Sequence, residues 1–600
     1  MFLQGAGRLV ERLNAWSVRH WKLIVLLFWV GYAAYALFDK WGQIRGFALG
    51  DTDDNLRMAQ VRGLLGGQGW FDLVQHRLDP MHGGADIHWS RLVDLPLAGL
   101  ILAFRPFLGG ADAERWAAAI APLLALLPML FALALITRRL VDKSAVPLVL
   151  VTISFAGATL GMFQPLRIDH HGWQLVLLAL ALSGLADPDR RRGGIVTGLA
   201  SAGSLAIGLE LLIYLALMGA AHVLFWVTDR VERTRLMAYA VSLSGGTVAA
   251  FLLFASDANR AAVCDALSPV WLGDALVGGA LMAGLTMVRA ERWTVRLALA
   301  VGAGLVVLAF HAIASPQCLT RLEGVSPEAT ELWLSHVREA RPIYRHGANT
   351  VALILSLPIA GLLGYGLLGW RARRNGELLR RIVAVALPGA TALALLFWQT
   401  RTGPAAQMMA LPGAVAIAFI LAPLAFNARI AWIRVPGTVL AVVVGLGALA
   451  PLIVGQLPVK AKTPAQKRVD LANRTCPSLR AMAPVARQPR GIVFSFVDLG
   501  PRIISVTRHD AIAGPYHRND RAIADVMKAF RGDEAQARRI ITAYGSHYLL
   551  VCPNMSTATI FMAEAPKGFY AQLVKGQVPG WLTPVDLGPR SPFLMWRVTR

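Results

Sequence analysis

Long apolar runs separated by short arginine-rich turns fill residues 1–457. Runs of roughly 18–22 apolar residues match the thickness of a lipid bilayer. Because the basic turns recur at alternate ends of the runs, we expect about thirteen membrane-spanning helices. The expected spans cover residues 23–38, 112–136, 145–163, 172–186, a helical hairpin over 194–228, then 236–255, 271–288, 297–313, 347–369, 382–399, 404–425 and 436–456.

The distribution of positive charge predicts how these helices are oriented. The first apolar run is preceded by Arg8, Arg12, Arg19 and Lys22. Basic residues before a first span favour a cytoplasmic N-terminus, and an odd number of spans then leaves the C-terminus outside. We expect long external loops at 39–111 and 314–346, with the moderately apolar segment 94–108 at the membrane interface. The whole pattern is typical of a multi-pass protein of a bacterial-type inner (plasma) membrane.

The composition changes after residue 457. Apolar and polar positions alternate over 491–497, helical patterns follow at 519–531 and 533–544, and a short strand is expected at 547–552. Residues 458–600 therefore predict a small α/β domain, which the topology places in the periplasm.

The chain carries 59 Lys and Arg against 36 Asp and Glu, a net charge of +23. Such an excess is also found in nucleic-acid-binding proteins. Here the arginines occupy short turns at helix ends, as the positive-inside rule requires. We therefore expect a lipid bilayer, and no nucleic acid, as the partner of these charges.

The four cysteines offer a check on this topology. Cys264, Cys318, Cys476 and Cys552 all fall in segments predicted to be external, where an oxidising compartment permits disulfides. Their positions favour the pairs Cys264–Cys318 and Cys476–Cys552. Four cysteines allow three connectivities, and buried free thiols are the alternative.

The first candidate for chemistry follows the first span. Asp51, Asp53 and Asp54 lie within four residues, and Arg57 and Arg62 come after them. Carboxylates this close need a counter-charge, either these arginines or a hard divalent cation. The alternative is a solvated helix N-terminus, where aspartate is favoured as a cap.

A second polar cluster, Asp169-His170-His171, begins a later helix on the same predicted side of the membrane. Asp169 and His171 can point into one site if the segment is extended or just enters a helix. Carboxylate oxygens with an imidazole suit Mn²⁺ or Mg²⁺. A polar helix start that serves only solubility is the alternative.

With these motifs in place, the chain resembles the type C glycosyltransferases (GT-C), in particular the catalytic subunit of oligosaccharyltransferase. The shared plan comprises about thirteen spans, long first and fifth external loops and an external C-terminal domain. Asp53 with Arg62 nine residues later fits the family's first motif, and Asp169-His170-His171 matches its second. The resemblance implies metal ligation by Asp53, Asp169 and His171, with Asp53 also catalytic and with Asp51, Asp54 and His170 in auxiliary roles.

The fifth external loop of the family carries a Thr/Ser-x-x-Glu motif. Its counterpart here runs from His336 to Glu339, so the resemblance implies a catalytic Glu339 with an auxiliary His336. Arg401, near the outer end of a late helix, is the candidate for binding the donor's phosphates through paired hydrogen bonds. A solvated loop and a snorkelling arginine are the alternatives.

One family motif is missing. The Trp-Trp-Asp-Tyr-Gly acceptor motif is absent from residues 458–600. In its place, Tyr516, His517 and Arg518 offer stacking and hydrogen-bonding groups on the acceptor side. A surface loop with Asn519 as a helix cap is the alternative.

The resemblance implies transfer of a sugar or oligosaccharide from a polyprenyl-(pyro)phosphate carrier to an extracytoplasmic acceptor, which is a glycan, a lipid or a protein. We expect a divalent metal, Mn²⁺ or Mg²⁺, to assist. The loop 314–346 is long enough to act as a lid, and we expect its Glu339 half to contact the active site only when substrate is bound. A transporter or flippase of lipid-linked glycans is the alternative, although such proteins bind their substrate near mid-membrane. A non-catalytic scaffold would need no acidic external cluster.

Overall fold

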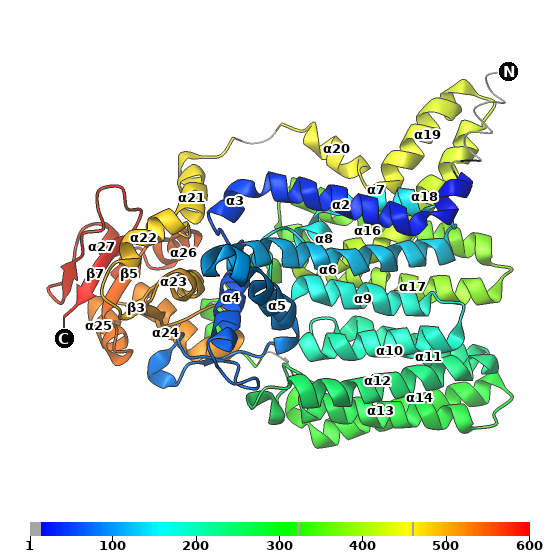
Figure 1. Ribbon diagram of the computed structural model, residues 1–600, viewed down its shortest axis with the longest axis horizontal. Helices are drawn as coiled ribbons and strands as arrows, with labels where there is room; N and C mark the ends of the chain where they lie inside the picture. Colours follow the sequence, from blue (N-terminus) through cyan, green and yellow to red (C-terminus); the bar gives the residue numbers. More distant parts are fainter. Residues whose placement is uncertain (1–11, 13, 321–323, 459–460, 600) are drawn as a thin grey trace.

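The structure, a computed structural model, describes residues 12, 14–320, 324–458 and 461–599. Arg8, one of the basic residues that predict the orientation, lies outside these ranges. A bundle of long helices forms the larger part of the molecule, and a smaller mixed domain caps one end of it (Figure 1). The chain is a multi-pass membrane protein.

Within the described part of the chain, eight helical segments are long and apolar enough to cross a membrane. They are α2 (Trp21–Asp39), α6 (Gly110–Leu140), η2 with α12 (Arg230–Phe254), α13 (Pro269–Met287), α14 (Trp293–Ala314), α16 (Ala348–Ala372), α17 (Gly376–Leu395) and η8 with α18 (Thr400–Phe426). Two shorter apolar helices are α9 (His171–Leu185) and α11 (Leu212–Thr228), which follows α10 (Arg190–Ile207). The expected count of about thirteen spans is therefore not confirmed.

Two expected spans are broken. The run 145–163 forms α7 (Val146–Ile153) and α8 (Gly157–Gly161), and the side-chain Oε1 of Gln407 accepts the Ala158 amide (2.9 Å) at the start of α8. The run 436–456 forms α19 (Ala431–Gly445) and α20 (Leu449–Gly455), bent by 97°. Gly447 lies in that bend with φ +67°, a conformation that glycine adopts without strain.

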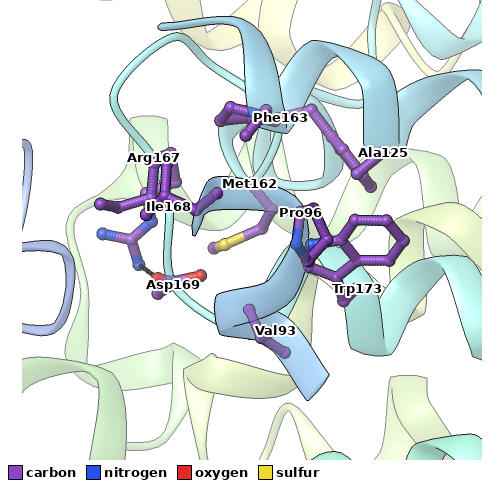
Figure 2. A pocket seen from close by; sticks show the side chains of 13 residues that line it. Val93, Pro96, Ala125, Met162, Phe163, Arg167, Ile168, Asp169 and Trp173 are labelled. Atoms are coloured by element: carbon purple, nitrogen blue, oxygen red, sulfur yellow. Dashed lines mark ion pairs between the residues drawn. The ribbon is translucent and has the colours of Figure 1, made fainter. Parts of the chain in front are cut away.

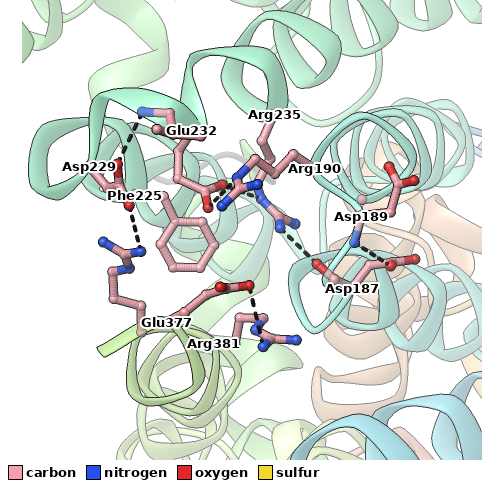
Figure 3. A network of polar contacts seen from close by, with 12 residues as sticks. Asp187, Asp189, Arg190, Phe225, Asp229, Glu232, Arg235, Glu377 and Arg381 are labelled. Atoms are coloured by element: carbon pink, nitrogen blue, oxygen red, sulfur yellow. Dashed lines mark hydrogen bonds and ion pairs between the residues drawn. The ribbon is translucent and has the colours of Figure 1, made fainter. Parts of the chain in front are cut away.

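The basic turns of α6, α10, α12 and α17 gather in one ion-pair network at the bundle end away from the capping domain (Figure 3). Asp187 is its centre: Nη2 of Arg139 lies 2.6 Å and Nε of Arg192 lies 2.7 Å from its Oδ2. Nη2 of Arg235 donates to the Asp187 carbonyl (2.7 Å) and Nε of Arg235 donates to Glu232 (2.7 Å). These turns, predicted to be cytoplasmic, thus lie together on one side.

Residues 39–111, predicted to be the first external loop, form a layer between the bundle and the capping domain (Figure 1). It contains α3 (Trp41–Arg45), α4 (Thr52–Leu65), a hairpin of β1 (Val74–Gln75) with β2 (Ala85–Asp86), and α5 (Arg91–Leu108). The helix α5 covers the segment expected at the interface and does not meet the criteria for a span.

The C-terminal domain is built on a five-stranded sheet of order β4-β3-β5-β7-β6. The strands are β3 (Ile492–Phe494), β4 (Asp510–Ala511), β5 (Tyr548–Val551), β6 (Leu582–Pro584) and β7 (Leu594–Val598). The first three are parallel, and β7 runs antiparallel to β5 and β6. The predicted strands at 491–497 and 547–552 correspond to β3 and β5. The predicted helices correspond to α24 (Asp520–Arg531) and α25 (Glu534–Ala543).

The core of this domain includes residues of the first external loop. Leu56, Leu78 and Trp89 are buried in the same apolar cluster as the sheet and its helices. Leu78 also forms a parallel bridge with Ala511 at the edge strand β4. The loop and the domain therefore share one core, which fixes how the cap sits over the bundle.

Both favoured disulfides are formed. Cys264 pairs with Cys318, with Cα atoms 5.3 Å apart, and Cys476 pairs with Cys552, with Cα atoms 6.5 Å apart. The first joins the loop between α12 and α13 to the loop that follows α14, and the second lies within the C-terminal domain.

Candidate active site

The acidic cluster begins α4. Asp51 is its N-cap, and Oδ1 of Asp51 accepts hydrogen bonds from the amide (2.6 Å) and hydroxyl (3.0 Å) of Thr52. Asp53 and Asp54 follow in the first turn, where the helix dipole favours negative charge. Asp51 therefore does have the capping role weighed above, and Asp53 and Asp54 face other groups.

Asp54 fixes the turn that carries the second cluster. Its fully buried Oδ1 accepts hydrogen bonds from the backbone amides of Ile168 (2.7 Å) and Asp169 (3.1 Å). Leu166, just before, adopts φ +74° and donates its amide to the Ala118 carbonyl (2.9 Å). A non-glycine residue in this conformation persists only when its surroundings hold it. Asp54 thus has a structural part in the site.

The two clusters meet as the motifs predicted. Oδ1 of Asp169 accepts the amide of His171 (3.0 Å), the first residue of α9, so Asp169 satisfies one of the free amides at the helix start. One ligand atom from each of Asp53, Asp169 and His171 lies within 4.8 Å of the other two. Asp169 is buried, and the other two side chains are half-buried.

The counter-charge comes from Arg167. Its guanidinium lies 2.7 Å from Asp51, 2.7 Å from Asp169 and 3.5 Å from Asp54. Arg57 and Arg62, the counter-charges suggested by the sequence, form ion pairs with other carboxylates. Arg57 pairs with Asp94 (2.8 Å) at a fully buried site, and Arg62 pairs with Glu114 (2.6 Å).

One guanidinium does not neutralise all of these carboxylates. Burial opposes ionisation of Asp169, but His171 and Arg167 outweigh it and lower the pKa of Asp169. For Asp53, burial and then the charges of Asp51 and Asp169 raise the pKa well above its ordinary value. The centre of the cluster is therefore short of positive charge. Two carboxylates and an imidazole around such a centre fit a divalent cation.

A further acid that the sequence did not single out lies beside the site. Glu210, between α10 and α11, places Oε1 2.8 Å from Nε2 of His170 and accepts the Gln174 side-chain amide (2.9 Å). Ligand atoms of His170, His171 and Glu210 also lie within 4.8 Å of one another. In the sequence, Glu210 is marked only by its position in the turn of the hairpin expected over 194–228.

Aromatic side chains close the site from above. Trp89 lies under the Arg57 guanidinium (4.5 Å) and packs against His170 (5.2 Å) and Tyr516 (5.5 Å), measured between ring centroids for the last two. The Tyr516 hydroxyl donates to the Thr52 carbonyl (3.1 Å). Burial, and next the Asp53 charge, raises the pKa of Tyr516 well above its usual range.

Comparisons with known proteins bear on this arrangement. No protein-family model and no curated protein matches the sequence. The structure is similar to archaeal oligosaccharyltransferase AglB from Archaeoglobus fulgidus, solved in complex with an inhibitory peptide and a dolichol-phosphate. The TM-score is 0.65 at 15% identity, over 95% of this chain and 73% of that one.

Two further structures of the Archaeoglobus fulgidus oligosaccharyltransferase are similar. One is tethered with an acceptor peptide containing the NVT sequon via a disulfide bond, with a TM-score of 0.63 at 15% identity over 98% of this chain and 75% of that one. The other is a complex with Zn and sulfate, with a TM-score of 0.55 at 16% identity over 86% and 67%. The chain has the GT-C fold. This confirms the fold class that the sequence predicted.

In this GT-C fold the fifth-loop residues contact η8 and the C-terminal domain. Glu339 is exposed in η6 (Arg338–Ala340), which packs beside η8 (Thr400–Thr402) and its exposed Arg401. Backbone bonding joins the two segments, since the Thr400 amide donates to the Arg341 carbonyl (2.9 Å). Nε2 of His336 lies 2.6 Å from Oε1 of Glu564 in the C-terminal domain. A catalytic Glu339 and a phosphate-binding Arg401 stay predictions.

The acceptor-side candidates contact the membrane part. Tyr516 is buried above α4, and both His517 and Arg518 reach Asp265 in the loop after α12. Asn519 precedes α24 without capping it, and its Oδ1 accepts the Gly514 amide (3.3 Å). Acceptor binding by these residues stays a prediction.

Two cavities adjoin Arg167. Figure 2 shows the smaller, about 10 Å³, where apolar side chains including Val93, Phe163 and Trp173 surround Arg167 and Asp169. The other, about 380 Å³, extends along α3 and α8 and is lined by Lys40 and Gln43 as well as Arg167. Its volume is in the range of small-molecule sites.

Proposed function

We propose that this protein is a membrane glycosyltransferase that transfers a sugar or oligosaccharide from a polyprenyl-(pyro)phosphate carrier to an acceptor outside the cytoplasm. The observation that carries the proposal is the convergence of Asp53, Asp169 and His171 beneath the C-terminal domain. The similar AglB, solved with a dolichol-phosphate, supports a lipid-phosphate carrier. A substrate at this external end suits surface chemistry better than transport through mid-membrane.

Asp53, Asp169 and His171 would hold a divalent cation, Mn²⁺ or Mg²⁺, which when bound would neutralise charge that develops on the leaving phosphate. The Zn and sulfate complex of the Archaeoglobus fulgidus enzyme supports a cation and an oxyanion in this fold. Asp53 also orients or deprotonates the acceptor, because it carries the carboxyl that Arg167 does not contact.

Arg167 and Asp54 keep this arrangement in place. Arg167 holds Asp51 and Asp169 in their charged forms, and Asp54 fixes the turn that carries Asp169. The cavity of about 380 Å³ beside Arg167 gives room for part of a carrier, with Lys40 as an additional cation. Arg401 binds donor phosphate and Glu339 joins the site when the fifth loop closes.

The acceptor is a glycan, a lipid or a protein, since residues 458–600 carry no Trp-Trp-Asp-Tyr-Gly motif. The proposed location is a bacterial-type inner membrane, with the N-terminus cytoplasmic and the C-terminal domain periplasmic. The basic network around Asp187, at the far end from that domain, supports this orientation (Figure 3).

The test is transfer from a polyprenyl-linked sugar by the purified protein. We expect activity to vanish in excess chelator and return with Mn²⁺ or Mg²⁺. Asp53→Asn, Asp169→Asn and His171→Gln should each lower the rate by about 100-fold or more, since changing only the outer partners of metal ligands already costs about 10–100-fold. Asp112→Asn, at an exposed external acid, is the matched control. Full activity in chelator, or in Asp169→Asn, contradicts the proposal. Glycan and lipid profiles of a deletion strain identify the acceptor.

A further inference from the structure

A second group of potential metal ligands joins three separate segments of the chain. His88 follows the β1–β2 hairpin, Asp265 lies in the loop between α12 and α13, and His517 begins η10 (His517–Asn519) of the C-terminal domain. One ligand atom from each lies within 4.8 Å of the other two. We propose that these three side chains form a structural zinc site that clamps the C-terminal domain to the membrane part.

The donor set has the chemistry that zinc takes. Nε2 of His517 lies 2.6 Å from Oδ2 of Asp265, and the rings of His88 and His517 lie 4.3 Å apart between centroids. Two imidazoles with one carboxylate are common zinc ligands. Ligand atoms around a tetrahedral zinc ion stand about 3.3 Å apart, so small side-chain rotations bring this group into coordination.

His88 is the member of this group with an unpaired ring nitrogen among the described residues. Its Nδ1 is buried and has no hydrogen-bond partner among the described residues. Buried polar atoms are nearly always paired, so an unpaired ring nitrogen beside a carboxylate and a second imidazole calls for a ligand. A zinc ion bound to this nitrogen would satisfy it.

Arg518 orients the Asp265 carboxylate, and the group around it keeps one net negative charge that a cation could neutralise. Its Nε and Nη2 each lie 2.7 Å from Asp265, and Nη1 pairs with Asp86. Two carboxylates against one guanidinium leave a net charge of one negative unit when both imidazoles are neutral. Outer hydrogen bonds of this kind fix the ligand atoms of metal sites.

The neighbours of Asp265 and His88 in the chain are fixed by other contacts. Cys264, next to Asp265, is tied to Cys318 by the disulfide, and its carbonyl accepts the Trp271 indole (3.0 Å). Trp89, next to His88, packs on His170 and Tyr516 above the candidate active site. A zinc ion here would therefore fix the cover of that site.

The test counts zinc in full-length protein that has been stripped with chelator and then supplied with Zn²⁺ alone. His171 belongs to both of the other ligand groups, so His171→Ala isolates the site proposed here. We expect His171→Ala to bind one equivalent of zinc and His171→Ala with His88→Phe to bind none. Phe keeps a ring against His517 and removes both nitrogens, and His88 makes no side-chain bond that the change would break.

In the otherwise unchanged chain, His88→Phe should lower bound zinc by one equivalent, which covers the case in which His171→Ala does not fold. His76→Phe, at an exposed histidine of the same loop, should leave the zinc content unchanged. Zn²⁺ should also raise the Tm of His171→Ala and not of the double variant. Equal zinc content with and without His88 overturns the proposal. The readout is independent of sugar transfer, so the two proposals fail separately.

Discussion

Arg167 shows how a single residue sets the charge of the candidate site. Arg57 and Arg62 stand on the same helix as the aspartates and are the natural counter-charges in the sequence. The helix turns them toward Asp94 and Glu114 instead. Only the docking of the turn before α9 onto α4, through the backbone bonds to Asp54, brings Arg167 among the acids. Sequence spacing does not contain that docking, so this residue could not be predicted.

Replacing Arg167 by Met should destabilise the protein by about 3 kcal/mol, since it leaves the buried Asp54 and Asp169 without their cation. The partly exposed Asp51 adds little to this loss. Because a dication supplies the missing charge, Mn²⁺ should raise the Tm of Arg167→Met more than that of the unchanged protein. Arg115→Met, which loses one exposed partner, is the control. If Mn²⁺ does not raise the Tm of Arg167→Met, that result would count against a cation at this site.

At the scale of elements, the sequence predicted the helices that depend on their own residues. Asp51 caps α4, and the periods of 519–531 and 533–544 correspond to α24 and α25. The sequence did not predict the helix boundaries at which a side chain from a distant part of the chain makes a contact. The expected span at 145–163 is divided into α7 and α8, and Gln407 of α18 accepts the Ala158 amide at the start of α8, a contact that hydropathy does not show.

The loop 314–346 shows the same division. Its middle docks on the C-terminal domain: Glu328 pairs with Lys528 (2.7 Å), and Arg531 donates to the Leu332 carbonyl (2.9 Å). The half with Glu339 has an exposed carboxylate and is joined instead to the segment between α17 and α18, through the Arg341 carbonyl and the Ile343 amide.

We therefore expect donor to protect residues 338–346 from hydrogen exchange, while 326–336 are protected with or without donor. Hydrogen exchange followed by mass spectrometry resolves the two halves. Glu564→Gln, which removes the charge that faces His336 and Arg531, should loosen 326–336 alone. Equal exchange of 338–346 in the presence and absence of donor would contradict loop closure.

At the scale of the molecule, composition predicts a boundary near residue 458, and the strands of the five-stranded sheet all follow that position (Figure 1). What composition could not predict is the shared core. Leu56, Leu78 and Trp89 belong to the first external loop by sequence and to the C-terminal domain by burial. A hydrophobic pattern shows that a residue is buried, but not which element covers it.

This sharing predicts that residues 458–600 do not fold stably alone. Each buried side chain of this size contributes about 1.5–3 kcal/mol, so losing Leu56, Leu78 and Trp89 removes roughly 4.5–9 kcal/mol. A whole domain is stable by only about 5–15 kcal/mol. The isolated segment also loses the bridge from Leu78 to Ala511 and so exposes the edge of β4.

The measurement is thermal unfolding of expressed 458–600, followed by circular dichroism, against the full-length protein. We expect a broad transition or aggregation from the segment alone, and recovery when residues 50–90 are fused to it through a flexible linker. A matched fusion with Leu56, Leu78 and Trp89 changed to Ser should not recover, because it restores the chain length without the core. Cooperative unfolding of unfused 458–600 near the full-length Tm would instead show that the external loop rests on a domain that is already complete.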